Sequence, residues 1–181
     1  MLTLARSVSS CILVKTLSKT SFQLLTILEV LFYLNHTSLD PFLFPNWQRN
    51  LTGVIAQDSL LQGALYWQVE AGMALLTHRD HEWLLGFSPL MVEYKFLNPK
   101  RKWAPTFLAG AGFSMTNWDD PADYELGTEF EFLIHAGGGI EVFCESGSYS
   151  FNYRLFHISN AGMKRPNIGL NSHVFSLGFR F

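Results

Sequence analysis

Two side chains near the end of the chain have the types and spacing needed for a nucleophile–base pair. His157 and Ser159 are two positions apart in an alternating segment, so both point to the same side of a predicted β-strand. An imidazole beside a hydroxyl can remove its proton and turn the oxygen into a nucleophile. Asn171 lies in the next segment, in step with His173 and Phe175, so it faces the same side and could accept a hydrogen bond from the imidazole N–H. His157, Ser159 and Asn171 are therefore candidate catalytic residues; the alternative at this point is a His-x-Ser pair that occurs by chance, with a strand-end His that lies at an interface.

The segments that must position these residues alternate with a period of two, which is typical of β-strands. In residues 147–157 the odd positions are mostly hydrophobic and the even positions mostly polar, and residues 172–181 repeat the pattern. The alternation places His157 and Ser159 on the hydrophobic face, where unpartnered polar groups are costly. Six segments of this kind lie between residues 63 and 181. In the segment that begins at Trp83, Pro89 interrupts the alternation and predicts a β-bulge.

Composition and strand length favour a membrane barrel over a soluble fold. Only 15% of the 181 residues are charged, against roughly 25% in an ordinary soluble domain. The longest stretch without Asp, Glu, Lys or Arg, residues 103–118, contains Pro105 and is shorter than the roughly 20 residues of a spanning helix. The segments match the about 9–11 residues of a membrane strand better than the usual 5–6 of globular strands. We predict an all-β, antiparallel transmembrane β-barrel; a soluble lipocalin-like binder with a hydrophobic interior is the alternative.

The polar face of the segments is predicted to fill the interior of this barrel. It includes Glu129, Glu131, His135 and Glu141, which we interpret as a structural polar network. Barrel closure needs partners for both edge strands, because lipid offers no hydrogen bonds. Eight strands are therefore expected, and the two beyond the six must come from before residue 63, with residues 22–33 and 42–57 as candidates.

The first part of the chain has two interpretations. Lys15 and Lys19 precede the hydrophobic residues 21–34, which is typical of a secretory signal, but no small-residue cleavage site follows directly. We expect residues 1–56 to be a signal-like or atypical N-terminal segment that could supply the first strands. Residues 57–181 are then the outer-membrane β-barrel with a lipid-facing active site.

Charge and cysteine content exclude several partners. The formal net charge is −2 and no basic stripe is visible, so nucleic acid is not expected as a partner. Cys11 and Cys144 are the only cysteines and have no metal-binding spacing. We expect neither a metal nor a cofactor.

A longer motif surrounds the predicted catalytic residues. His157, Ser159, Asn160 and Ala161 are followed by Pro166, Asn167 and Gly169. The pattern His-x-Ser-Asn-Ala with a Pro-Asn-x-Gly turn resembles the lipid A 3-O-deacylase (PagL) family. The resemblance extends through residues 130–139, 107–113 and 86–94, and covers residues 63–181 in all.

This resemblance implies a fold, an activity and residue roles. The fold would be an eight-stranded barrel in the bacterial outer membrane, and the activity removal of an ester-linked acyl chain from lipid A of lipopolysaccharide. Ser159 would be the nucleophile and His157 the general base, while Asn160 and the backbone N–H near Gly162 would stabilise the oxyanion. The implied partners are lipid A and outer-membrane lipids, and a homodimer is a further possibility.

One position departs from the family pattern. The best-known members have Glu where this chain has Asn171. A neutral amide oxygen can orient an imidazole, as in Cys-His-Asn proteases, but stabilises an imidazolium less. The alternative function is therefore a catalytically inactive structural or lipid-binding outer-membrane barrel on the same scaffold.

Overall fold

The fold consists of antiparallel β-strands. A computed structural model describes residues 20–33, 36–75, 82–117, 126–165, 167 and 169–181. These residues form β1 (Thr20–Tyr33), β2 (His36–Leu43), β3 (Asn46–Asn50), β4 (Gly63–Leu75), β5 (Trp83–Phe96), β6 (Trp103–Thr116), β7 (Phe130–Phe143), β8 (Ser148–Ser159) and β9 (Leu170–Arg180). In the described part of the chain, no helix has the length and hydrophobicity to cross a membrane.

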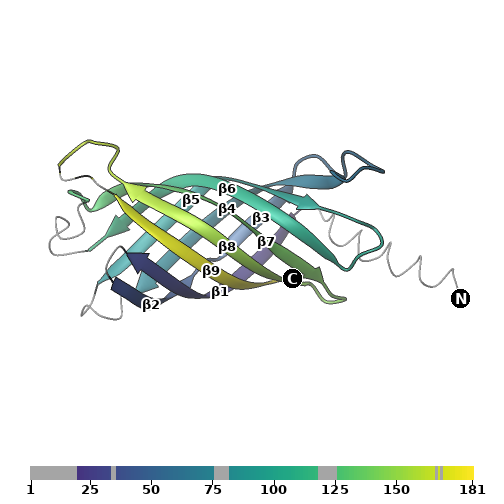
Figure 1. Cartoon of the computed structure of the whole chain (residues 1–181), viewed down its shortest axis with the longest axis horizontal. Helices are drawn as coiled ribbons and strands as arrows, with labels where there is room; N and C mark the ends of the chain where they lie inside the picture. The colour runs from purple at the N-terminus through teal and green to yellow at the C-terminus, as the bar shows by residue number, and fades with distance from the viewer. Residues whose placement is uncertain (1–19, 34–35, 76–81, 118–125, 166, 168) are drawn as a thin grey trace, which may run out of the picture.

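The strands follow one another in chain order from β3 to β9, each paired antiparallel with the next. β2 and β3 are separated only by Phe44 and Pro45, and both pair with β4, so they occupy one strand position between them. β1 pairs with β2 and β3 on one side and with β9 on the other. The first and last strands are thus linked, and the strands wrap around a common axis with eight strand positions (Figure 1).

The strands missing from the six predicted ones come from residues 20–50. β1 overlaps the candidate segment 22–33, and β2 and β3 overlap the start of the candidate segment 42–57. Most of the hydrophobic segment 21–34, which had the character of a signal, therefore lies in β1. Residues 1–19 lie outside the described residues.

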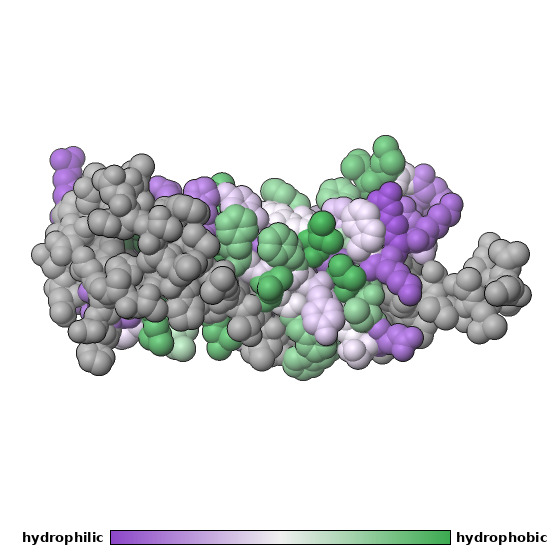
Figure 2. Space-filling model, turned by 60° about the horizontal axis from the view of Figure 1, so that its bottom comes forward, coloured by the Kyte–Doolittle hydropathy of each residue, from purple (hydrophilic) through white to green (hydrophobic). Residues whose placement is uncertain are grey.

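The six long strands alternate between an exposed hydrophobic wall and a buried, largely polar interior. β4 to β9 are each 11–14 residues long, enough to cross a bilayer. Outward-facing hydrophobic residues such as Leu90, Phe107 and Ile134 are more than half exposed, whereas inward-facing Glu70, Glu131 and Arg154 are buried. On the face shown in Figure 2, hydrophobic and pale residues lie in the middle, and strongly hydrophilic residues gather at the right-hand end. This inverted distribution is the one expected of a transmembrane barrel.

The predicted bulge is present in β5. The register shifts between Phe87 and Leu90 on the β6 side, and between Gln68 and Glu70 of the facing strand β4. The Pro89 carbonyl, on the bulge, accepts a hydrogen bond of 2.9 Å from Trp67 Nε1. After the bulge the alternation resumes, with Leu90 and the following even positions facing outward.

One residue predicted for the interior lies elsewhere. Glu129 precedes β7 and is exposed, whereas Glu131, His135 and Glu141 are buried as expected. Alternation would point Glu129 into the barrel only if the strand included it, but β7 begins at Phe130.

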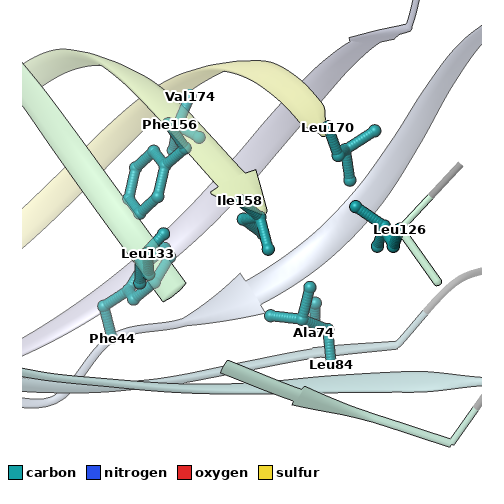
Figure 3. Close-up of a cluster of buried hydrophobic side chains, with 9 residues drawn as sticks. All are labelled: Phe44, Ala74, Leu84, Leu126, Leu133, Phe156, Ile158, Leu170 and Val174. Carbon is teal, nitrogen blue, oxygen red and sulfur yellow. The ribbon is translucent and has the colours of Figure 1, made fainter. Parts of the chain in front are cut away.

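Two hydrophobic clusters lie inside the barrel, one near each end. The first packs beside the segment 160–169, at what we call the 160–169 end (Figure 3); it contains Phe44, Ala74, Leu84, Leu126, Leu133, Phe156, Ile158, Leu170 and Val174. The second lies at the C-terminal end and contains Ala64, Tyr66, Leu97, Ala104 and Phe143. Buried ion pairs fill the space between them, including Arg154 with Glu70 at 2.7 Å and Lys95 with Glu141 at 2.5 Å.

Candidate active site

The predicted pair of His157 and Asn171 is in direct contact. The two residues are opposite each other in the register of β8 and β9, and His157 Nδ1 lies 2.9 Å from Asn171 Oδ1. Both side chains project from the outer face: Asn171 is exposed and His157 half-buried. The cross-strand pair therefore places the third predicted residue next to the imidazole.

This contact sets the tautomer of the imidazole. An amide oxygen only accepts hydrogen bonds, so His157 Nδ1 must carry the proton and donate it. Nε2 is then unprotonated and is able to accept a proton from a hydroxyl. A triad base needs this tautomer, and the opposite one accounts for the loss of activity when the triad Asp of a serine protease becomes Asn.

Ser159 lies two residues further along β8 and on the same outer face. It is the last residue of the strand, it is half-buried, and its cross-strand partner on β7 is Phe132. Two residues along a strand are separated by roughly 6.6 Å, a span that an imidazole and a serine side chain can bridge. The hydroxyl thus lies at the edge of the hydrophobic wall, beside the loop that begins at Asn160.

Gly169 forms the backbone surface against which these side chains lie. A Cβ placed on it would be 2.8 Å from His157 Cε1 and 3.3 Å from Ser159 Cβ, and its φ of +82° is in the left-handed region. Only glycine combines this backbone conformation with this close approach at low cost. The role of Gly169 was not predicted from the sequence; its place in the Pro-Asn-x-Gly turn was the available signal.

Asn160 organises the loop that follows Ser159. It is fully buried, and its Nδ2 donates to the carbonyls of Leu126 and Lys164, while its Oδ1 accepts the N–H of Gly162 at 3.0 Å. Its own N–H donates to Asn167 Oδ1 at 3.0 Å. The Asn160 amide is therefore engaged by Leu126 and by the loop itself, and the N–H of Gly162 is engaged within the loop. These hydrogen bonds hold the turn, and the oxyanion role of Asn160 and the Gly162 N–H stays a prediction.

The site is supported from inside the barrel. Ile158 lies between His157 and Ser159 in the sequence and points inward, as do Leu170 and Phe156, and all three belong to the hydrophobic cluster at the 160–169 end (Figure 3). Alternation thus places the candidate catalytic side chains on the outer face and the intervening side chains in a packed core. A site on two strands backed by such a core is held more precisely than a site on loops.

The surroundings of the site are hydrophobic, with one further polar pair. Ile134 and Leu155, which flank His157, are 58% and 49% exposed. Tyr153 Oη and His173 Nδ1 are 2.7 Å apart on the same outer wall. Among the described residues, His, Cys, Asp and Glu side chains form no group of three that could hold a metal ion.

The fold and the site together define an antiparallel β-barrel that carries a His–Asn–Ser cluster on its hydrophobic outer wall. The model of one protein family, lipid A 3-O-deacylase (PagL), matches residues 41–180. The chain belongs to this family. The match begins before the resemblance that the sequence motifs supported, and it includes β3 and part of β2.

Two curated relatives are both described as lipid A deacylase PagL. The protein of Pseudomonas aeruginosa is 33% identical over 89 residues, which are 49% of this chain and 48% of the relative. The protein of Bordetella bronchiseptica is 28% identical over 119 residues, which are 66% of this chain and 60% of the relative. The chain thus spans about half and three fifths of the lengths of these relatives.

Solved structures share the fold. The crystal structure of the outer membrane enzyme PagL matches with a TM-score of 0.58 and 19% identity, over 90% of this chain and 98% of that one. Neisserial surface protein A (NspA) matches with a TM-score of 0.66 and 12% identity, over 90% and 96% of the two chains.

Proposed function

We propose that this protein is an outer-membrane esterase that removes an ester-linked acyl chain from lipid A. Family membership supports the reaction class, and the hydrogen bond between His157 Nδ1 and Asn171 Oδ1 is the observation that supports a working site in this chain. The family description further suggests the 3-O-linked chain as the one removed.

The proposed reaction runs in two steps. His157 Nε2 takes the proton of Ser159 as its Oγ attacks the acyl carbonyl carbon, and the tetrahedral intermediate collapses with loss of the sugar oxygen. That oxygen receives the proton from His157. A water molecule, deprotonated by His157, then attacks the acyl-serine, and His157 returns the proton to the departing Ser159 Oγ as the fatty acid is released. Asn171 accepts the Nδ1–H hydrogen bond throughout, which holds the ring in the productive tautomer.

The position of the site fits a substrate whose acyl chains stay in the bilayer. His157 and Ser159 lie where the hydrophobic wall meets the 160–169 loop, with exposed Phe132 and Ile134 on the neighbouring strand. An acyl chain can lie against these side chains while its ester reaches Ser159. The enzyme then has no need to extract the chain from the lipid, which would cost about 0.8 kcal/mol per CH₂.

Two basic side chains suit the headgroup of such a substrate. Lys164 and Arg165 are exposed in the loop directly beyond Ser159. Lipid A carries phosphate groups, and basic side chains at a membrane surface bind anionic headgroups. We therefore assign the phosphate contact to this loop.

The proposed oxyanion donors must change their hydrogen-bond partners before they can stabilise an oxyanion. The Gly162 N–H could turn to the oxyanion only by releasing Asn160 Oδ1, a bond of 3.0 Å. Losing one oxyanion donor typically costs 10²–10³ in rate, so this exchange must be favourable in the transition state.

Mass spectrometry of lipid A from cells that express the chain tests the proposal. The wild type should remove one acyl chain, and Ser159→Ala should abolish the removal. Ser146→Ala, at an exposed turn of the opposite end, is the matched control. Deacylation that persists in Ser159→Ala would refute the assignment of Ser159 as the nucleophile. A folded wild type without deacylation would favour a structural or lipid-binding barrel.

A further inference from the structure

The loop that joins β3 to β4 exposes hydrophobic side chains at the C-terminal end of the barrel. Residues 51–62 contain four exposed large hydrophobic residues: Leu51 at 53%, Ile55 at 41%, Leu60 at 99% and Leu61 at 64%. Single exposed leucines are common, but a group within one short loop marks an interaction surface. Turns at this end of outer-membrane barrels are usually short, so a 12-residue connection needs a reason. Figure 2 shows hydrophobic residues projecting at one end of the molecule, beside strongly hydrophilic ones.

Specific contacts hold this loop in place. Val54 packs against the hydrophobic cluster inside the C-terminal end of the barrel. Ile55 and Gly63 exchange two backbone hydrogen bonds, of 2.8 and 3.1 Å. The Ser59 hydroxyl donates to the Ala56 carbonyl at 2.7 Å and accepts the Leu61 N–H at 3.1 Å. With Val54 anchored inside the barrel, the loop presents Leu60 and Leu61 outward.

The outward side of the loop continues the lipid-facing wall. Tyr94 lies on the outer face of β5, and its hydroxyl donates to the Leu61 carbonyl at 2.5 Å. The Tyr94 ring packs edge-on against Phe96, with ring centroids 4.9 Å apart. Aromatic residues of this kind mark the level of the membrane interface in outer-membrane barrels. Leu60 and Leu61 therefore lie next to that level.

A basic turn lies directly beside the loop. The Leu97 N–H donates to the Gln62 carbonyl at 2.9 Å, which ties residues 97–102 to the loop. Lys100, Arg101 and Lys102 are exposed on this turn, and the Arg101 guanidinium lies 4.9 Å from the ring centre of Trp103. Asp58 is the one acidic residue of the two segments, so positive charge predominates.

We propose that residues 51–62 and 97–102 form a binding edge for anionic phospholipid. Leu60 and Leu61 enter the boundary between headgroups and acyl chains, and Lys100, Arg101 and Lys102 bind the phosphate groups. Hydrophobic anchors flanked by basic residues are the combination that interfacial membrane segments use. The choice of leaflet rests on the proposed function: if the 160–169 end meets lipid A, this end meets the opposite, phospholipid leaflet.

A fluorescent label at Leu60 tests the insertion. Leu60→Cys, in a chain whose Cys11 and Cys144 are replaced by Ser, is labelled with an environment-sensitive dye and placed in nanodiscs that hold one protein copy. We expect blue-shifted emission and stronger quenching by nitroxide lipid than by an aqueous quencher. The matched control is a label at Ser146→Cys, on the exposed β7–β8 turn of the same end. A Leu60 label as accessible to the aqueous quencher as the Ser146 label would overturn the proposal.

Lipid composition tests the charge. Nitroxide-labelled phosphatidylglycerol should quench the Leu60 label several-fold more than labelled phosphatidylcholine, since each basic side chain near a membrane contributes about fivefold to partitioning. The triple variant Lys100→Gln, Arg101→Gln, Lys102→Gln should bring the ratio close to one. An unchanged ratio in that variant would refute phosphate binding. Shielding of Leu60 that appears only in liposomes with many protein copies would assign the surface to a second copy and reject the lipid.

These readouts do not depend on catalysis. A chain that shows no deacylation but has a shielded Leu60 label contradicts the proposed function alone. A chain that deacylates lipid A with an exposed Leu60 label contradicts the phospholipid edge alone. Heat-modifiable migration on SDS gels shows for every variant that the barrel has folded.

Discussion

Replacing Gly169 by Ala is expected to lower the deacylation rate about a hundredfold in a barrel that still folds. The new Cβ would be 2.8 Å from His157 Cε1, whereas carbon atoms in contact are normally about 3.5–4.0 Å apart. The overlap is thus roughly 1 Å. The same Cβ would be 2.9 Å from the Ile158 carbonyl, which is backbone and cannot move aside easily. The imidazole is therefore the group that shifts, and a misplacement of about 1 Å can cost 10² in rate.

Backbone strain must be separated from this displacement. Gly169 has a φ of +82°, and a non-glycine residue in the left-handed region costs about 1–2 kcal/mol. Gly53 supplies the control, because its φ is +65° and a Cβ there would meet nothing within 4 Å. Gly53→Ala therefore introduces the same kind of backbone strain at the opposite end of the barrel, far from the candidate site.

The assay is the initial rate of fatty-acid release from purified lipopolysaccharide, with the folded fraction of each variant measured on unheated SDS gels. We expect Gly53→Ala to react at the wild-type rate and Gly169→Ala to be about 10² slower. A folded Gly169→Ala within about threefold of the wild type would show that the ring tolerates the shift, and the argument from close approach would be wrong.

Three further perturbations have defined outcomes. Asn171→Ala should lower the deacylation rate by about 10²–10⁴, because nothing then holds the His157 tautomer. Asn171→Glu should match or exceed the wild-type rate. Equal rates for the wild type and both variants would show that Asn171 has no role in catalysis. Asn160→Ala should lower the free energy of unfolding in urea by about 3 kcal/mol, since two carbonyls and the Gly162 N–H lose their partner. Arg154→Met should lower the free energy of unfolding, measured in the same way, by about 3–5 kcal/mol, because it leaves Glu70 buried without its ion-pair partner. Adding Glu70→Gln should recover part of that loss.

The strands were predictable because their pattern is local. A period of two in hydrophobicity can be read from neighbouring residues, and β4 to β9 follow the six predicted segments. The bulge at Pro89 was predictable for the same reason, since proline cannot donate to the ladder. The first strands were predicted only as the candidate segments 22–33 and 42–57, because β1 to β3 do not alternate cleanly; their pairing with β4 and β9 makes them part of the barrel.

The sequence by itself determined which face carries the candidate catalytic residues His157 and Ser159. His157 and Ser159 share a side because alternation along one strand is a property of the backbone. Asn171 joins them only through the register of β8 and β9, and a slip of one residue would turn its side chain to the interior.

Tertiary structure alone decided which groups are available to react. The amide of Asn160 and the N–H of Gly162 have the right chemistry for an oxyanion site, but their partners are set by the fold of the 160–169 loop. Gly169 reaches His157 for the same reason, because residues 12 apart in the chain meet where the loop returns to β9. Periodicity specifies the direction of a side chain, whereas its contacts depend on chain segments that the pattern does not connect.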